Sequence, residues 1–336
     1  MPIAAILGCS GPTLTAAEAE FFHAADPLGF ILFQRNCQTP EQVRRLVQDL
    51  RTTIGRSDAP VLIDQEGGRV ARLRPPAWRR TPAAGRIGAL AAQDPAVAAE
   101  AAKLNAQLMG RELADLGITV DCAPVLDLQL PGAHSVVGDR GFGADPELVA
   151  RLGRAVCDGL RSTGITPVIK HAPGHGRALV DSHHELPRVD ASLAELRRTD
   201  FVPFKRLADM PWAITAHVVY TAIDPERPAT TSSTVIADII RGEIGFEGVL
   251  VSDDLSMEAL KGDIGDRARR ALAAGCDLAL HCNGKLDEMR AVAAVAGPIG
   301  SATAVRLSRS AANPAQPAAF DRGTMESRLD SLLATG

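Results

Sequence analysis

Carboxylates and imidazoles are concentrated in one stretch of this chain, where their spacing suits proton transfer. The string KHAPGHG, residues 170–176, follows an apolar run, and DSHH, residues 181–184, comes soon after it. Asp181 and His183 are two residues apart, so in an extended loop both side chains point the same way. A carboxylate that binds one imidazole nitrogen raises the basicity of the other nitrogen. The pair is therefore a candidate general acid that later acts as a base.

Two further segments place carboxylates directly after apolar runs. In SDDLSM, residues 252–257, adjacent carboxylates at a strand end point to opposite sides, so only one faces a cavity. We predict Asp253 as a nucleophile, whereas Asp254 orients a neighbour or caps a helix starting near Ser256. Asp64 ends the run VLID before QEGGRVAR, where two glycines permit a sharp turn. Its paired oxygens suit two hydroxyls of a sugar.

Short apolar runs that alternate with helical patterns are the elements that must position these residues. We predict eight strands, at Ile3–Leu7, Gly29–Phe33, Val61–Asp64, Thr119–Asp127, Pro167–Lys170, Trp212–His217, Gly248–Asp253 and Asp277–His281. We predict helices at Glu41–Ile54, Pro95–Leu116, Pro146–Ser162, Leu193–Leu207 and Arg267–Ala274, with caps at Thr39, Asp94 and Asp190.

Buried parallel strands alternating with helices predict an α/β fold, a (β/α)₈ TIM-type barrel. An open dinucleotide-binding sheet is disfavoured because the first turn, GCSG, does not match GxGxxG. We predict one catalytic domain, residues 1–336, with the last ~20 residues as a peripheral segment. Barrels carry their sites at the carboxyl ends of the strands, and ionisable residues follow nearly every predicted strand.

The overall composition excludes several classes of partner. A net charge of −4 spread along the chain argues against nucleic-acid binding. We find no apolar run of ~18 residues, so we expect no membrane span. The six cysteines form no CxxC pair, which favours free thiols and a cytoplasmic location. We expect no cofactor and no metal, a small sugar as the partner molecule, and a monomer.

Four strings together carry a resemblance to a known family: DQEGGRVAR, GDRGF, KHAPGHG with DSH downstream, and SDDLSM. They resemble the β-N-acetylhexosaminidases of glycoside hydrolase family 3, and more narrowly the bacterial single-domain enzymes that recycle peptidoglycan fragments. The similarity runs from Gly29 to Gly284. It implies Asp253 as nucleophile and His183 as acid/base with Asp181 as its partner. The sugar-binding positions that it implies are Asp64, Arg72, Arg140, Lys170 and His171. Ala172 departs from the family, which commonly has Phe there.

The resemblance implies a retaining β-N-acetylglucosaminidase that removes terminal GlcNAc from peptidoglycan fragments, GlcNAc-anhydro-MurNAc and its peptides, through a glycosyl-aspartate. One alternative is a phosphorylase, because a neutral imidazole repels an incoming phosphate less than a carboxylate does. A second is a metal-dependent barrel hydrolase, with ligands drawn from Lys170, His171, His175, His183, His217 and Asp253. A third is a sugar-binding barrel without activity. The low aromatic content favours a short pocket over a long groove.

Overall fold

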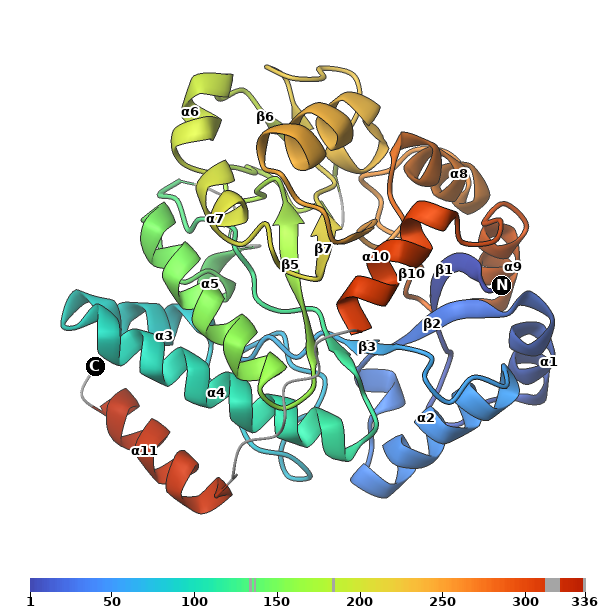
Figure 1. Ribbon diagram of the computed structural model, residues 1–336, viewed down its shortest axis with the longest axis horizontal. Coiled ribbons are helices and arrows are strands. Elements are labelled where there is room, and N and C mark those ends of the chain that lie inside the picture. The colour runs from blue at the N-terminus through green and yellow to red at the C-terminus, as the bar shows by residue number, and fades with distance from the viewer. Residues whose placement is uncertain (133–134, 136, 183–184, 312–320, 335–336) are drawn as a thin grey trace.

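Eight parallel strands form the centre of the molecule and confirm the predicted (β/α)₈ barrel (Figure 1). The computed structural model describes residues 1–132, 135, 137–182, 185–311 and 321–334. The strands pair in the order β10-β1-β2-β3-β4-β5-β7-β9, and a parallel bridge between Val251 and Leu278 joins the two ends. The barrel strands are β1 (Ile3–Gly8), β2 (Pro27–Leu32), β3 (Val61–Ile63), β4 (Val120–Asp121), β5 (Thr166–Ala172), β7 (Trp212–Thr215), β9 (Val249–Val251) and β10 (Ala279–His281).

Helices surround the barrel on its outside (Figure 1). They are α1 (Ala16–Ala25), α2 (Pro40–Thr53), α3 (Ala84–Ala89), α4 (Pro95–Asp115), α5 (Pro146–Arg161), α6 (Leu193–Arg198), α7 (Phe201–Arg206), α8 (Ile264–Ala274), α9 (Leu286–Ala293), α10 (Ser301–Ala311) and α11 (Arg322–Ala334). A π-helical segment (Val235–Glu243) precedes β9, and a small parallel sheet joins β6 (Arg188–Val189) to β8 (Val219–Tyr220).

Two buried layers hold these elements together. Side chains that point inward from the strands, such as Ile6, Leu62, Val168 and Val249, fill the barrel. Outward-pointing side chains form a larger apolar shell beneath the helices. Because both faces of each strand are covered, the strands read as continuous apolar runs in the sequence.

The predicted strand Thr119–Asp127 is regular only at Val120–Asp121, which is a correction to its length. Pro124 has no N–H to donate to a ladder, so the regular pairing cannot continue through it. The chain still runs beside β5, because the Leu126 amide donates to the Lys170 carbonyl at 2.7 Å. This irregular path brings Asp127 to the carboxyl end of the barrel.

The helix predicted at Leu193–Leu207 is two helices, α6 and α7, separated at Thr199 and Asp200. Pro203 cannot donate the helical hydrogen bond to residue 199, and its ring crowds that carbonyl. The predicted cap at Asp190 is also wrong. Ser192 caps α6 by accepting from the Glu195 amide at 3.2 Å. Thr39 and Asp94 cap α2 and α4 as predicted.

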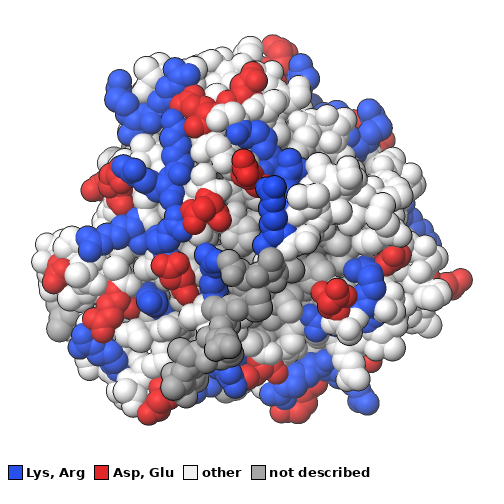
Figure 2. Space-filling model, viewed as in Figure 1, with Lys and Arg blue, Asp and Glu red and all other residues white. Residues whose placement is uncertain are grey.

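The last two helices take different positions (Figure 1). Helix α10 covers the amino ends of the strands, where Arg306 pairs with the buried Asp277 at 2.6 Å. Helix α11 packs along α4, and Arg328 forms an ion pair with Glu100 at 2.8 Å. Figure 2 shows acidic and basic side chains intermixed over the face that it displays. None of the described helices is long and apolar enough to cross a bilayer.

Candidate active site

A cavity of about 220 Å³ opens at the carboxyl ends of the strands. Most of the polar residues that follow the strands in the sequence meet there, as the barrel geometry requires. Its polar lining comprises Asp64, Glu66, Arg72, Asp127, Arg140, Lys170, His171, His175, Ser182, Asp253 and Asp254. All five predicted sugar-binding residues and the predicted nucleophile therefore line one cavity.

Four of the five predicted sugar-binding residues, all but His171, form one chain of ion pairs together with Glu66. Asp64 accepts from Lys170 Nζ at 2.7 Å and from Arg72 Nη2 at 2.9 Å. Lys170 Nζ also lies 2.6 Å from Glu66 Oε1. Glu66 in turn holds Arg140 in a bidentate pair, with both contacts at 2.8 Å. The planar guanidinium and the carboxylate match each other, which fixes the direction of both side chains.

These pairs keep all the groups charged inside the barrel. Burial alone would raise the pKa of Glu66, but Arg140 and Lys170 outweigh it and lower the pKa to about 2. Burial is likewise outweighed at Asp64, where Lys170 and Arg72 hold the pKa well below its usual range. Burial would lower the pKa of Lys170, but the carboxylates of Asp64 and Glu66 raise it. The cavity therefore presents a fixed network of hydrogen-bond donors and acceptors that suits sugar hydroxyls.

Asp127 organises the turn that contains the motif KHAPGHG. Its Oδ2 lies 2.6 Å from His171 Nδ1, and its Oδ1 accepts from the backbone amides of His171 at 3.2 Å and His175 at 2.6 Å. Burial would raise the pKa of Asp127, yet His171 and His175 lower it to about 2. An ionised Asp127 accepts from Nδ1–H, so the other imidazole nitrogen of His171 is left for the cavity.

Asp253 follows β9 and lines the cavity. Its Oδ1 accepts from the Asp254 amide at 2.8 Å, and its own amide donates to Thr215 Oγ1 at 3.3 Å. Burial alone would raise the pKa of Asp253. The pKa nevertheless lies below its ordinary value, because it is lowered by His171, His217, the Asp254 amide and Lys170. The carboxylate is thus ionised at neutral pH, as a nucleophile must be.

Asp254 also lines the cavity, but its carboxylate is already engaged. It accepts from the Ser256 amide at 3.0 Å, the Ser256 hydroxyl at 2.6 Å and the Cys282 amide at 3.1 Å. No helix starts near Ser256, since α8 begins at Ile264. Of the two neighbouring carboxylates, Asp253 is therefore the one available to a ligand.

The loop after KHAPGHG is attached to the cavity wall at Ser182. The Ser182 hydroxyl lies 3.1 Å from His175 Nε2, and the Ser182 carbonyl accepts from the Ala259 amide at 3.3 Å. Asp181 is partly exposed beside Ser182 and is not among the residues that line the cavity. His183, the predicted acid/base, lies outside the described residues.

Sequence reasoning gave no role to Glu66 and named His175 only as a ligand in the metal-dependent alternative, although both lie in the strings that carried the resemblance. The sequence feature that could have identified them is their closeness to predicted site residues, because Glu66 is two residues from Asp64 and His175 is four residues from His171. Two other residues at strand ends lie elsewhere. His217 is buried, with Nε2 3.0 Å from the Asp254 carbonyl, and His281 is buried against Glu288 at 3.0 Å. Neither lines the cavity.

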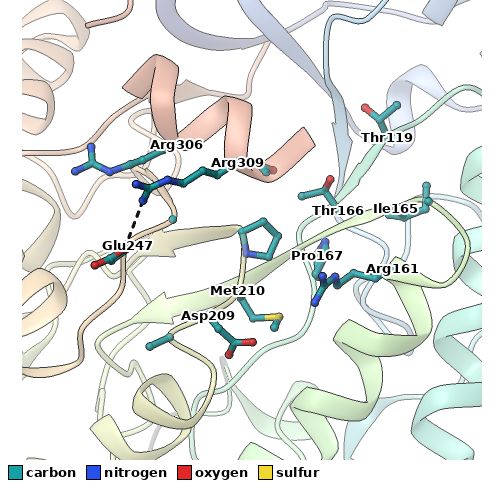
Figure 3. Close-up of a pocket in the computed structure, with 15 residues that line it drawn as sticks. Thr119, Arg161, Ile165, Thr166, Pro167, Asp209, Met210, Glu247, Arg306 and Arg309 are labelled. Atoms are coloured by element: carbon teal, nitrogen blue, oxygen red, sulfur yellow. Dashed lines mark hydrogen bonds and ion pairs between the residues drawn. The ribbon is translucent and has the colours of Figure 1, made fainter. Parts of the chain in front are cut away.

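A second cavity, of about 400 Å³, lies at the opposite end of the barrel (Figure 3). It is bounded by residues that precede β4, β5, β7 and β9, and by Arg306 and Arg309 of α10. Arg309 pairs with Glu247 at 3.5 Å. The described residues that line this second cavity include no histidine and no cysteine. The chemistry-bearing groups are thus at the carboxyl end. Among the described residues, no three His, Cys, Asp or Glu side chains are grouped to hold a metal ion.

Comparisons with known proteins agree with this arrangement. The model of the glycosyl hydrolase family 3 N-terminal domain matches residues 14–311. A beta-hexosaminidase from Alkalilimnicola ehrlichii is 43% identical over 282 residues, covering 83% of this chain and 80% of that protein. A beta-hexosaminidase from Pseudomonas aeruginosa is 41% identical, covering 86% of this chain and 85% of its own length.

The same similarity is found among solved structures. NagZ from Neisseria gonorrhoeae, in complex with N-trifluoroacetyl-D-glucosamine, superposes with a TM-score of 0.88 at 32% identity, covering 99% of this chain and 98% of that chain. A β-N-acetylglucosaminidase of family 3 from Paenibacillus gives a TM-score of 0.80 at 32% identity, covering 98% of this chain and 60% of that one. With the family model matching most of its length and the cavity built from the family's strings, this chain belongs to glycosyl hydrolase family 3 and is a glycoside hydrolase.

Proposed function

We propose that this enzyme is a retaining β-N-acetylglucosaminidase that uses Asp253 as its nucleophile. The observation that carries the proposal is an ionised carboxylate with one oxygen held by a backbone amide, in a cavity lined by hydrogen-bonding groups that suit sugar hydroxyls. Relatives named beta-hexosaminidase, and the binding of N-trifluoroacetyl-D-glucosamine by the Neisseria NagZ, support an N-acylated glucosamine as the sugar.

The proposed reaction has two steps. Asp253 attacks the anomeric carbon and forms a glycosyl ester, while the bond to the leaving oxygen breaks and His183 protonates that oxygen. Water then attacks the same carbon, His183 removes its proton, and the Asp253 carboxylate is released. Asp181 orients His183 in this scheme. Asp64, Arg72, Arg140, Lys170 and His171 bind the sugar.

The dimensions of the cavity favour a single terminal sugar. About 220 Å³ suits one monosaccharide, so the enzyme would cleave from the non-reducing end of its substrate. We propose peptidoglycan fragments, GlcNAc-anhydro-MurNAc and its peptides, as the substrates. All six cysteines are free thiols, which supports our proposal of a cytoplasmic enzyme.

The test is release of nitrophenol from the β-N-acetylglucosaminide by wild type and by Asp253→Ala, with and without EDTA. We expect metal-independent turnover that falls by roughly 10⁴-fold or more in the variant, because the other carboxylates that line the cavity are held by neighbouring groups. Asp58→Ala, at an exposed carboxylate, is the matched control. Full activity of Asp253→Ala would refute the role of Asp253. Accumulation of a glycosyl phosphate in phosphate buffer would instead identify a phosphorylase.

A further inference from the structure

His217 contacts the backbone next to the nucleophile, and the proposed reaction gives it no role. It follows β7 by two residues, and its Nδ1 lies 2.7 Å from Thr230 Oγ1. Thr230 belongs to a short 3₁₀ helix, Ala229–Thr231, which lies near the end of β7 because the Ala229 amide donates to the Val218 carbonyl at 2.9 Å. The side chains of His217 and Thr230 are both fully buried. Buried polar atoms need hydrogen-bond partners, so the partners of His217 indicate what it holds in place.

The second imidazole nitrogen of His217 reaches the backbone directly after the nucleophile. His217 Nε2 lies 3.0 Å from the carbonyl oxygen of Asp254. A carbonyl oxygen can only accept a hydrogen bond, so Nε2 carries a proton and donates it. Burial outweighs the nearby Asp253 carboxylate and lowers the pKa of His217 below its ordinary value. The ring is therefore neutral at pH 7, its Nδ1 accepts, and the hydroxyl of Thr230 is the donor to Nδ1.

The same series of hydrogen bonds continues to the backbone amide of the nucleophile. Thr230 Oγ1 lies 2.8 Å from Thr215 Oγ1, and because Thr230 donates its proton to His217, the Thr215 hydroxyl is the donor between the two threonines. Thr215 Oγ1 in turn accepts from the Asp253 amide at 3.3 Å. The Ala216 carbonyl, 3.1 Å from Thr230 Oγ1, is the acceptor that Thr230 would use if Nδ1 were protonated. One ordered chain of donors thus runs from the amide of the nucleophile to His217.

The two ends of this chain enclose the peptide unit that orients the nucleophile. The Asp254 N–H, which donates to Asp253 Oδ1 at 2.8 Å, lies along the backbone between the Asp253 amide and the Asp254 carbonyl. Holding the groups on both sides fixes the direction of that N–H, and with it the direction of the Asp253 carboxylate. A shift of about 1 Å in a reacting atom can cost roughly 100-fold in rate, so the direction of this carboxylate bears on catalysis.

We propose that His217 is a positioning residue, which holds the Asp253 carboxylate in its attacking orientation through hydrogen bonds to the backbone on both sides of it. The inference rests on the proposed function, because it requires Asp253 to be the nucleophile. His217 does not line the cavity, so it acts through Asp253 and not on the sugar. Loss of its Nε2 contact should therefore slow the chemical step and leave sugar binding intact.

The test compares two substitutions that each keep one of the two imidazole contacts. The amide of His217→Gln reaches the place of Nε2 and can donate to the Asp254 carbonyl, whereas the shorter His217→Asn reaches only the place of Nδ1, beside Thr230. We expect kcat for the nitrophenyl β-N-acetylglucosaminide to fall by roughly 10- to 100-fold in His217→Asn. In His217→Gln it should stay within about 5-fold of wild type. The inhibition constant of free GlcNAc should be unchanged in both variants.

His281→Asn is the matched control, because His281 is an equally buried histidine at a strand end whose Nε2 contacts Glu288 and not the backbone of the nucleophile. Its kcat should match that of wild type. Urea unfolding checks that every variant is folded under the conditions of the assay. Nitrogen-15 NMR of the imidazoles gives a readout from wild type itself: the signals that disappear in His217→Gln should belong to a ring protonated on Nε2 alone at pH 7.

The remaining outcomes separate this inference from the proposed function. Equal losses of kcat in His217→Gln and His217→Asn, or a matching loss in His281→Asn, would reveal a general packing effect and overturn the inference. A His217 ring protonated on Nδ1 alone would also overturn it, because Nε2 could not donate to the Asp254 carbonyl. If Asp253→Ala is inactive while His217→Asn keeps the kcat of wild type, only the inference fails. If Asp253→Ala is fully active, the proposed function fails and the inference falls with it.

Discussion

At the scale of single residues, Asp127 fixes the orientation of the His171 imidazole in the cavity. Its Oδ1 is occupied by two backbone N–H groups, so only Oδ2 can face His171 Nδ1. The carboxylate thereby selects the tautomer of His171 that carries its proton on Nδ1. In the proposed mechanism Asp127 is therefore a positioning residue that acts through His171.

Replacing Asp127 by Asn should disturb activity more than folding. The amide oxygen must stay where the two backbone N–H groups converge, which turns the NH₂ group toward His171 Nδ1 and forces the opposite tautomer. We expect kcat/KM for the nitrophenyl glycoside to fall by roughly 100-fold, as for other imidazoles held in the wrong tautomer. Asp58→Asn is the control. A variant with unchanged kcat/KM and an unchanged pH profile would contradict the role of Asp127.

His175 couples the stability of the protein to pH. Burial lowers its pKa to about 4, because the charged form is poorly solvated there. Between pH 6.5 and 4 the unfolded chain takes up a proton that the folded protein refuses, so stability falls as the pH falls. For a fully shifted pKa the loss is about 3 kcal/mol, of which about 2 kcal/mol is reached at pH 5.

His175→Gln should remove this dependence, since Gln can still contact Ser182 but does not titrate. We expect the free energy of unfolding of wild type to drop by about 2 kcal/mol more than that of the variant between pH 7 and pH 5. Urea unfolding at the two pH values measures both numbers. His23→Gln, at an exposed histidine, should follow wild type. Parallel losses in wild type and His175→Gln would show that His175 does not carry the effect.

At the scale of elements, the site depends on two segments that pack backbone against backbone. Gly176, at the end of the motif KHAPGHG, lies against the segment after β4: a Cβ there would be 2.3 Å from the Leu128 carbonyl oxygen. The next residue, Arg177, donates to Asp200 at 2.7 Å and to Thr199 at 3.1 Å, between the end of α6 and the start of α7. The motif is thus clamped on both sides.

Gly176→Ala should separate the motif from the segment that carries Asp127. The new methyl group meets backbone atoms, which cannot move aside as a flexible side chain can. We expect a loss of about 1–3 kcal/mol in the free energy of unfolding, together with a lower kcat/KM. Denaturant titration and nitrophenol release measure the two effects. Gly300→Ala, where a Cβ meets nothing within 4 Å, should change neither. A fully stable and active Gly176→Ala would show that this contact can relax.

At the scale of the whole molecule, Asp277 lies where β9 and β10 meet to close the barrel. Its Oδ2 accepts from the Leu250 amide at 2.9 Å and from Arg241 at 2.8 Å. Its Oδ1 accepts from Thr303 at 2.7 Å and from Arg306 at 2.6 Å. One buried carboxylate therefore connects β9, the π-helical segment and α10, which supports our proposal that the chain folds as one domain.

Asp277→Asn should destabilise the whole barrel without altering sugar binding. The variant keeps one acceptor oxygen for four donors and leaves two arginines without a counter-charge, so we expect a loss of about 2–4 kcal/mol. Calorimetry should show a single transition at a lower Tm, with an unchanged KM because Asp277 lies at the far end of the strands. Asp287→Asn, whose side chain is 96% exposed, is the control. Two separate transitions would contradict the single domain.

The sequence by itself determined the barrel architecture and which strand ends carry the polar residues of the cavity. Apolar runs and helical periods are local properties of the chain, so all eight strands and the barrel could be predicted from them. A barrel brings every strand end to one rim, which is why Asp64, Lys170, His171 and Asp253 were expected together. The strings that contain them also carried the resemblance to the family.

Only the tertiary structure decided which groups touch. The pairs formed by Lys170 with Asp64 and by Asp127 with His171 join residues 106 and 44 positions apart. Such contacts depend on strand register and on the path that the chain takes beyond its breaks at Pro124 and Thr199, and no local pattern specifies either of these. The same holds for the open space whose walls come from residues 68–86 and from α11, at the other end of the chain. Unlike secondary structure, these contacts arise only when distant segments fold against one another.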